Sequence, residues 1–169
     1  MAKAASSEEN VGAQIEDHRL KMAMRETILA ADPGKVLEVT PYAYMGHAYL
    51  VGFADPKVAE DLVGRVRALE GVRSVDSYLP ARPASRSTAG DLELKAKVKS
   101  ALALEPGQVV TRIEIEVLAG HVVLLGVVAS PEAVASAGER VRQVGGVTGV
   151  TNCLLTPEPE YESIRPKLR

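Results

Sequence analysis

Two stretches of this sequence decide the fold: GHAYLVGFADP at residues 46–56 and GHVVLLGVVASP at residues 120–131. Each has a Gly-His pair, an apolar run broken by a second glycine, and a proline that follows Asp or Ser. A short apolar run bounded by glycines is typical of a buried strand. Asp-Pro or Ser-Pro is typical of a helix start, because Asp and Ser cap helices and proline fits the first helical position. The two stretches therefore predict the same strand–helix unit twice.

The likeness between the two copies extends beyond these stretches. Pro56 pairs with Pro131, and three pairs of glycines also correspond, one member from each copy: Gly46 with Gly120, Gly52 with Gly126, and Gly71 with Gly146. Glycine adopts positive φ angles without steric cost and allows close approach of other chain segments. We interpret these six glycines as structural residues of turns, helix ends and packing contacts. Gly52 and Gly126 are interpreted as positions where a helix packs closely on the strand.

The remaining elements follow from hydrophobic periodicity. Apolar residues three and four apart predict a helix before each stretch, ended by Asp-Pro-Gly at 32–34 and Glu-Pro-Gly at 105–107. Alternating residues at 112–117 predict a half-buried strand, and Pro41 assigns the corresponding strand of the first copy to a sheet edge. A second helix and a last strand, at 72–79 or 147–155, complete the unit.

The fold class predicted is α+β, with two repeats of α-β-β-α-β. Each repeat is expected to form a three-stranded mixed sheet with two helices packed on one face, because a right-handed crossover makes the second and third strands parallel. The predicted organisation is listed in chain order: a flexible N-terminal segment at 1–14, a first domain at 15–80, a linker at 81–90, a second domain at 91–157, and an extended C-terminal tail at 158–169.

Composition excludes several classes of function. The net charge is −2, without the basic excess expected of a nucleic-acid-binding protein, and aromatic residues make up only 4%. Cys153 is the only cysteine, and no catalytic triad, phosphate-binding loop or metal-ligand cluster is visible. We therefore expect no enzyme activity, no cofactor and no metal. His47 and His121 follow equivalent turn glycines, where a metal site or pH sensor is one interpretation and an exposed turn residue is the favoured one.

One helix combines basic and apolar residues. The helix that begins at Asp91 has Lys95, Lys97 and Lys99 beside Leu92, Leu94 and Val98. Basic residues that flank an apolar stripe favour contact with an anionic membrane surface. These six residues are the candidate lipid contacts, and the alternative is an ordinary amphipathic helix with a solvated face.

The quoted stretches, together with GVRSV at 71–75 and GVTGV at 146–150, resemble the BON domain family of bacterial OsmY and nodulation proteins. The resemblance covers residues 15–80 and 88–157 and implies a tandem pair of such domains. It also implies a periplasmic or outer-membrane-associated protein that binds phospholipid and supports envelope integrity under osmotic stress. The N-terminus shows neither an export signal nor a lipoprotein cysteine, so a cytoplasmic location stays open.

These observations lead to three hypotheses for function. The first is a non-catalytic envelope protein that binds anionic phospholipid through its second domain. The second is a protein-interaction or self-association module, because exposed sheet edges can assemble side by side. The third is a small-ligand or ion sensor with its site between the domains.

Overall fold

The structure is a computed structural model that describes residues 2–31, 38–103 and 113–158, with side chains described from residue 14 onward. The chain divides into two compact units. Unit 1 comprises residues 1–82 and 158–169, and unit 2 comprises residues 83–157. Each unit has its own sheet and its own hydrophobic core, and each is described by itself.

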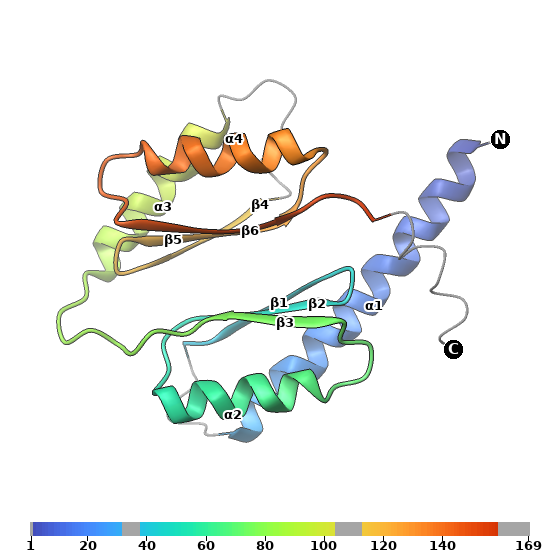
Figure 1. Ribbon diagram of the computed structural model, residues 1–169, viewed down its shortest axis with the longest axis horizontal. Coiled ribbons are helices and arrows are strands. Elements are labelled where there is room, and N and C mark those ends of the chain that lie inside the picture. The colour runs from blue at the N-terminus through green and yellow to red at the C-terminus, as the bar shows by residue number, and fades with distance from the viewer. Residues whose placement is uncertain (1, 32–37, 104–112, 159–169) are drawn as a thin grey trace. The chain divides into compact units, whose positions relative to one another are not determined.

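Unit 1 has the predicted order α-β-β-α-β (Figure 1). Its elements are α1 (Ala2–Ala31), β1 (Thr40–Tyr44), β2 (His47–Val51), α2 (Pro56–Arg67) and β3 (Ser74–Tyr78). The central strand β2 runs antiparallel to β1 and parallel to β3. Pro41 lies in the edge strand β1, as predicted, where a missing N–H is tolerated because that side of the strand has no partner strand.

Unit 2 repeats this arrangement with longer strands. Its elements are α3 (Thr88–Ala103), β4 (Ile113–Leu118), β5 (His121–Val127), α4 (Pro131–Arg142) and β6 (Gly149–Leu155). The strand β5 is central, antiparallel to β4 and parallel to β6. The predicted cap of α4 is present, because the Ser130 hydroxyl accepts a hydrogen bond of 3.2 Å from the backbone N–H of Ala133.

In each unit the two helices pack on the same face of the sheet and enclose an aliphatic core. In unit 1, Met24 of α1 and Leu62 of α2 are buried against Leu50 of β2. In unit 2, the core is made by residues of the corresponding elements: Val98, Leu102, Leu124 and Val141. The predicted fold class, two repeats of a mixed three-stranded sheet with helices on one face, is confirmed.

The sheet face opposite the helices differs between the repeats. In unit 1, four of the five tyrosines in the chain point to this face, since they alternate with core residues along the strands: Tyr42, Tyr44, Tyr49 and Tyr78. The rings of Tyr44 and Tyr49 lie 6.3 Å apart between centroids. In unit 2, the central strand places Val123 and Leu125 on the corresponding face. The two repeats therefore share a scaffold and differ in the side chains on this sheet face.

Some of the predicted boundaries differ from the structure, and others lie outside the described residues. Helix α1 begins at Ala2, so residues 2–14 are continuous with it, consistent with the high helix propensity of alanine. Helix α3 begins at Thr88, inside the predicted linker 81–90. The predicted helix stops at 32–34 and 105–107, and the tail after Glu158, lie outside the described residues.

Candidate functional site

Each repeat holds its first hairpin turn with an aspartate from its first helix. In unit 1, the Asp17 carboxylate accepts hydrogen bonds from the backbone N–H groups of Met45, at 2.8 Å, and Gly46, at 3.1 Å. Met45 and Gly46 both have positive φ angles, of 51° and 76°, as a two-residue type I′ turn requires. The aspartate satisfies both turn N–H groups at once. It thereby fixes the start of β2 relative to α1.

Asp91 of α3 makes the same contacts in unit 2. Its carboxylate accepts hydrogen bonds from Ala119 N–H at 3.1 Å and Gly120 N–H at 3.0 Å, and it also pairs with Arg86 at 3.0 Å. Asp17 and Asp91 occupy equivalent positions of the two repeats, but the sequence analysis assigned them no role. The available signal was that each Asp precedes its Gly-His pair by the same number of residues.

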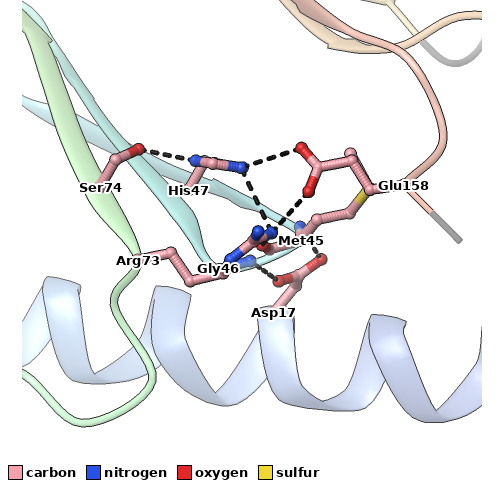
Figure 2. Close-up of polar contacts among 7 residues, drawn as sticks. All are labelled: Asp17, Met45, Gly46, His47, Arg73, Ser74 and Glu158. Carbon is pink, nitrogen blue, oxygen red and sulfur yellow. Dashed lines mark hydrogen bonds and ion pairs between the residues drawn. The ribbon is translucent and has the colours of Figure 1, made fainter. Parts of the chain in front are cut away.

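His47 follows the turn of unit 1 and lies in a cluster of polar side chains (Figure 2). Its Nδ1 atom is 2.7 Å from the hydroxyl of Ser74, and its Nε2 atom is 3.2 Å from one carboxylate oxygen of Glu158. Arg73 donates to the other oxygen of Glu158 at 2.8 Å. Arg73 also donates to the backbone carbonyl of Met45 at 3.1 Å, which holds the guanidinium over the turn.

The contact with Glu158 indicates which ring nitrogen of His47 is protonated. A carboxylate can only accept hydrogen bonds, so Nε2 carries a proton and donates a hydrogen bond to Glu158. The Ser74 hydroxyl then donates to Nδ1 when the ring is neutral and accepts from it when the ring is protonated. The hydrogen bond from Arg73 lowers the pKa of Glu158 below its ordinary value of 4.5, so this carboxyl is ionised at neutral pH.

The equivalent histidine of unit 2 has different surroundings. His121 Nε2 lies 2.8 Å from the Thr151 hydroxyl, and burial lowers the pKa of His121 below its ordinary 6.5. Thr148 and Gly149 stand at the positions of Arg73 and Ser74. The backbone is held alike in both repeats, since Arg73 N–H bonds to Gly46 O at 2.8 Å and Thr148 N–H bonds to Gly120 O at 3.0 Å. Only the side chains differ.

The six candidate lipid contacts of α3 do not share one exposed surface of the helix. Leu94 and Val98 are buried in the core of unit 2 and are removed from the proposed contact set. Leu92 is 69% exposed. Lys95 lies 3.8 Å from Glu116, Lys97 lies 2.8 Å from Glu93, and Lys99 is exposed. The sequence pattern grouped these residues together because it counted every apolar residue near a lysine, whichever side of the helix it occupies.

The six glycines singled out from the repeat all have positive φ angles. A Cβ atom on Gly52 would also lie 2.1 Å from the carbonyl oxygen of Glu38, which precedes β1. The sequence interpretation placed a helix against this glycine. The structure instead places the backbone of the segment before the edge strand there.

Among the described residues, no group of three or more His, Cys, Asp or Glu side chains is arranged to hold a metal ion. None of the helices in the described ranges combines the length and the hydropathy that crossing a bilayer requires.

Comparison with known proteins gives one family and one distant structural likeness. Two structures of CdsD, a structural protein of the type III secretion system of Chlamydia trachomatis, are similar to this chain. The structure described as its C-terminal domain shares 11% identity, with 84% of this chain and 67% of that chain covered and a TM-score of 0.35. The other shares 12% identity, with 90% and 69% covered and a TM-score of 0.37. A likeness this distant assigns no function.

No curated protein matches the chain. The family model of the BON domain matches residues 90–156, which include most of α3 and all of β4, β5, α4 and β6. BON domains are a non-catalytic binding family. The second repeat of this chain is therefore similar to a BON domain over residues 90–156.

Proposed function

We propose that this chain is a non-catalytic protein of the bacterial envelope with two BON-like domains, and that it attaches peripherally to anionic phospholipid surfaces through α3 of unit 2. The family match to the second repeat supports a binding role. Unit 1 has the same element order, strand pairing and aspartate-held turn, which supports a second domain of the same kind. A role in envelope integrity under osmotic stress follows from the family resemblance and belongs to this proposal.

The observation that carries the lipid proposal is the exposed side of α3. Leu92, Lys95 and Lys99 follow i, i+3, i+7 spacing, so they share one side of the helix. Leu92 is the most exposed large apolar side chain among the described residues. Lys97 lies on another side of the helix, where it pairs with Glu93, and contributes less. One exposed apolar side chain beside two lysines fits a negatively charged membrane surface.

The expected affinity is weak and depends on salt. Each lysine near an anionic surface contributes about 1 kcal/mol, which corresponds to about a fivefold change in partition coefficient. Insertion of the Leu92 side chain adds about 1.5 kcal/mol from burial of apolar area. The ion pair of Lys95 with Glu116, at 3.8 Å, weakens the contribution of that lysine.

Co-sedimentation of the full chain with vesicles tests the proposal. Wild type is compared with Lys99→Gln and with Arg25→Gln, which removes one exposed positive charge at the aligned position of α1. We expect binding to vesicles that contain phosphatidylglycerol and none to pure phosphatidylcholine. We also expect about fivefold weaker binding for Lys99→Gln and no change for Arg25→Gln. Equal losses in the two variants, or equal binding to both kinds of vesicle, would contradict the assignment to α3.

A second candidate function, self-association, is favoured by one specific observation. Ile15, Met22 and Leu29 are 49%, 44% and 60% exposed and recur every seven residues on α1. They lie on the side of α1 opposite its core residues Leu20 and Met24, because that side is about half a turn away. Exposed apolar residues at seven-residue spacing are typical of paired helices. The partner in this candidate is α1 of a second copy of the chain.

Sedimentation equilibrium separates the two functions. If α1 pairs with a second copy, the full chain is a dimer at micromolar concentration and Met22→Glu makes it monomeric, because a carboxylate cannot be buried in an apolar helix interface. Leu92→Glu is the control, since it places the same charge on an exposed apolar position of α3. A wild-type chain that stays monomeric up to about 1 mM would contradict self-association.

A further inference from the structure

The cluster around His47 brings together two hydrogen-bond donors that cannot bond to each other. Arg73 Nη1 and His47 Nε2 lie 3.4 Å apart. Guanidinium has no acceptor atom, and Nε2 carries a proton as derived above, so neither nitrogen satisfies the other. An anion that accepts a hydrogen bond from each nitrogen satisfies both donors.

The carboxylate of Glu158 fills that place. One of its oxygens accepts from His47 at 3.2 Å and the other from Arg73 at 2.8 Å, which is the bridging arrangement that an oxyanion prefers (Figure 2). The side chains of Glu158 and Arg73 are 35% and 41% exposed. The contact is therefore open to solvent on one side, and exposed ion pairs of this kind are individually weak.

We propose that His47 and Arg73 form an oxyanion-binding notch in the first repeat, and that Glu158 is its internal occupant, which a carboxylate or phosphate group of an external ligand displaces. The notch is positioned by contacts from three elements. Ser74 of β3 orients the imidazole, and the Met45 carbonyl orients the guanidinium. Asp17 of α1 fixes the turn that contains Met45 and precedes His47. The proposal does not rest on lipid binding by α3.

The same contacts follow the order of a catalytic triad of nucleophile, base and acid. His47 lies between the hydroxyl of Ser74 and the carboxylate of Glu158. Arg73 argues against a catalytic triad. Its guanidinium lies 3.4 Å from Nε2, beside the nitrogen that meets the carboxylate. The same guanidinium shares the carboxylate that would have to stabilise the imidazolium. An arrangement that is poor for a base is good for holding an anion.

The second repeat provides an internal control. Its histidine, His121, occupies the same register position, but Thr148 and Gly149 replace the arginine and the serine. A Cβ atom at Gly149 would lie 2.6 Å from the imidazole Nδ1, so this ring packs against backbone where His47 meets a hydroxyl. We expect no oxyanion binding at His121.

The test is an NMR titration of the two imidazoles in the full chain at constant pH 7 and constant ionic strength. The probes are inorganic phosphate and acetate, added separately to wild type and to Glu158→Ala. We expect the His47 resonances to shift on addition of probe, with an apparent Kd about fivefold lower in Glu158→Ala, because the internal competitor is gone. The ratio of the phosphate and acetate affinities identifies which class of oxyanion the notch prefers.

A further variant, Arg73→Thr, introduces the residue of the second repeat. It should abolish the response of His47 in the Glu158→Ala background and leave the backbone spectrum of unit 2 unchanged. The proposal is overturned if neither probe shifts His47 in Glu158→Ala. It is also overturned if His121 responds as strongly as His47, which would show general binding to positive charge.

Discussion

The aspartate of α3 offers the sharpest test of how each repeat is held together. Asp91 is only 8% exposed, and its carboxylate accepts hydrogen bonds from the two turn N–H groups of Ala119 and Gly120 as well as pairing with Arg86. Asp91→Ala removes all three contacts. It leaves the guanidinium of Arg86, with 18% of its side chain exposed, without this carboxylate.

The magnitude follows from these contacts. A hydrogen bond to a charged group contributes about 1.5–3 kcal/mol to stability. Ala119 lies at the surface, so its N–H regains a bond to water when the carboxylate is removed, and the lower end of the range applies. Two such bonds give about 3 kcal/mol, and loss of the ion pair with Arg86 adds to this. A domain of this size has a total stability of about 5 kcal/mol, so the change is large.

Amide hydrogen exchange of the full chain measures this change in each unit separately. The reporters are the amides of Leu124 in β5 and Leu50 in β2, both in the central strand of a core. Asp91→Ala should accelerate exchange at Leu124 about 100-fold, and Asp17→Ala should do the same at Leu50. If Asp91→Ala leaves exchange at Leu124 within about twofold of wild type, the turn does not depend on this carboxylate.

The remaining predictions concern two helix glycines and a half-buried histidine. Gly138→Ala should destabilise unit 2 by about 1–3 kcal/mol in urea unfolding, because the new Cβ would lie 2.8 Å from the amide nitrogen of Asn152, which is hydrogen-bonded to the backbone of α4. Gly64→Ala should stabilise unit 1 by about 0.5–1 kcal/mol, because the space around its new Cβ is open. The changes in the free energy of unfolding of the two variants must therefore have opposite signs, and equal signs would contradict this prediction. Burial lowers the pKa of His121, so the unfolded state takes up a proton first as pH falls below about 6.5, and stability decreases there. His121→Gln should reduce the stability loss between pH 7.5 and 5.5, and an unchanged pH profile would refute this.

The internal repeat explains why so much of the fold could be predicted from the sequence. Pro41 identified an edge strand and therefore the central strand beside it, and the proline after Asp55 or Ser130 located the start of each second helix. These are local constraints on backbone geometry, which a single sequence expresses directly.

The candidate site depended on contacts that sequence periodicity does not express. His47 and His121 were treated as equivalent, and they differ because Arg73 lies beside only one of them. Glu158 belongs to neither repeat, so its contact with His47, across 111 positions of sequence, left no pattern to detect. In α3 the sequence pattern was present but misleading. The grouping of apolar residues with lysines included Leu94, which belongs to the core of unit 2.

The most direct test of the central claim is a map of where the full chain touches a membrane. Backbone amide shifts are recorded while bicelles that contain phosphatidylglycerol are added, with purely zwitterionic bicelles as the reference. We predict that the shifts specific to the anionic bicelles concentrate on α3 around Leu92, Lys95 and Lys99. Shifts centred on Met22 of α1, or equal shifts with both kinds of bicelle, would contradict attachment of this protein to anionic phospholipid through its second domain.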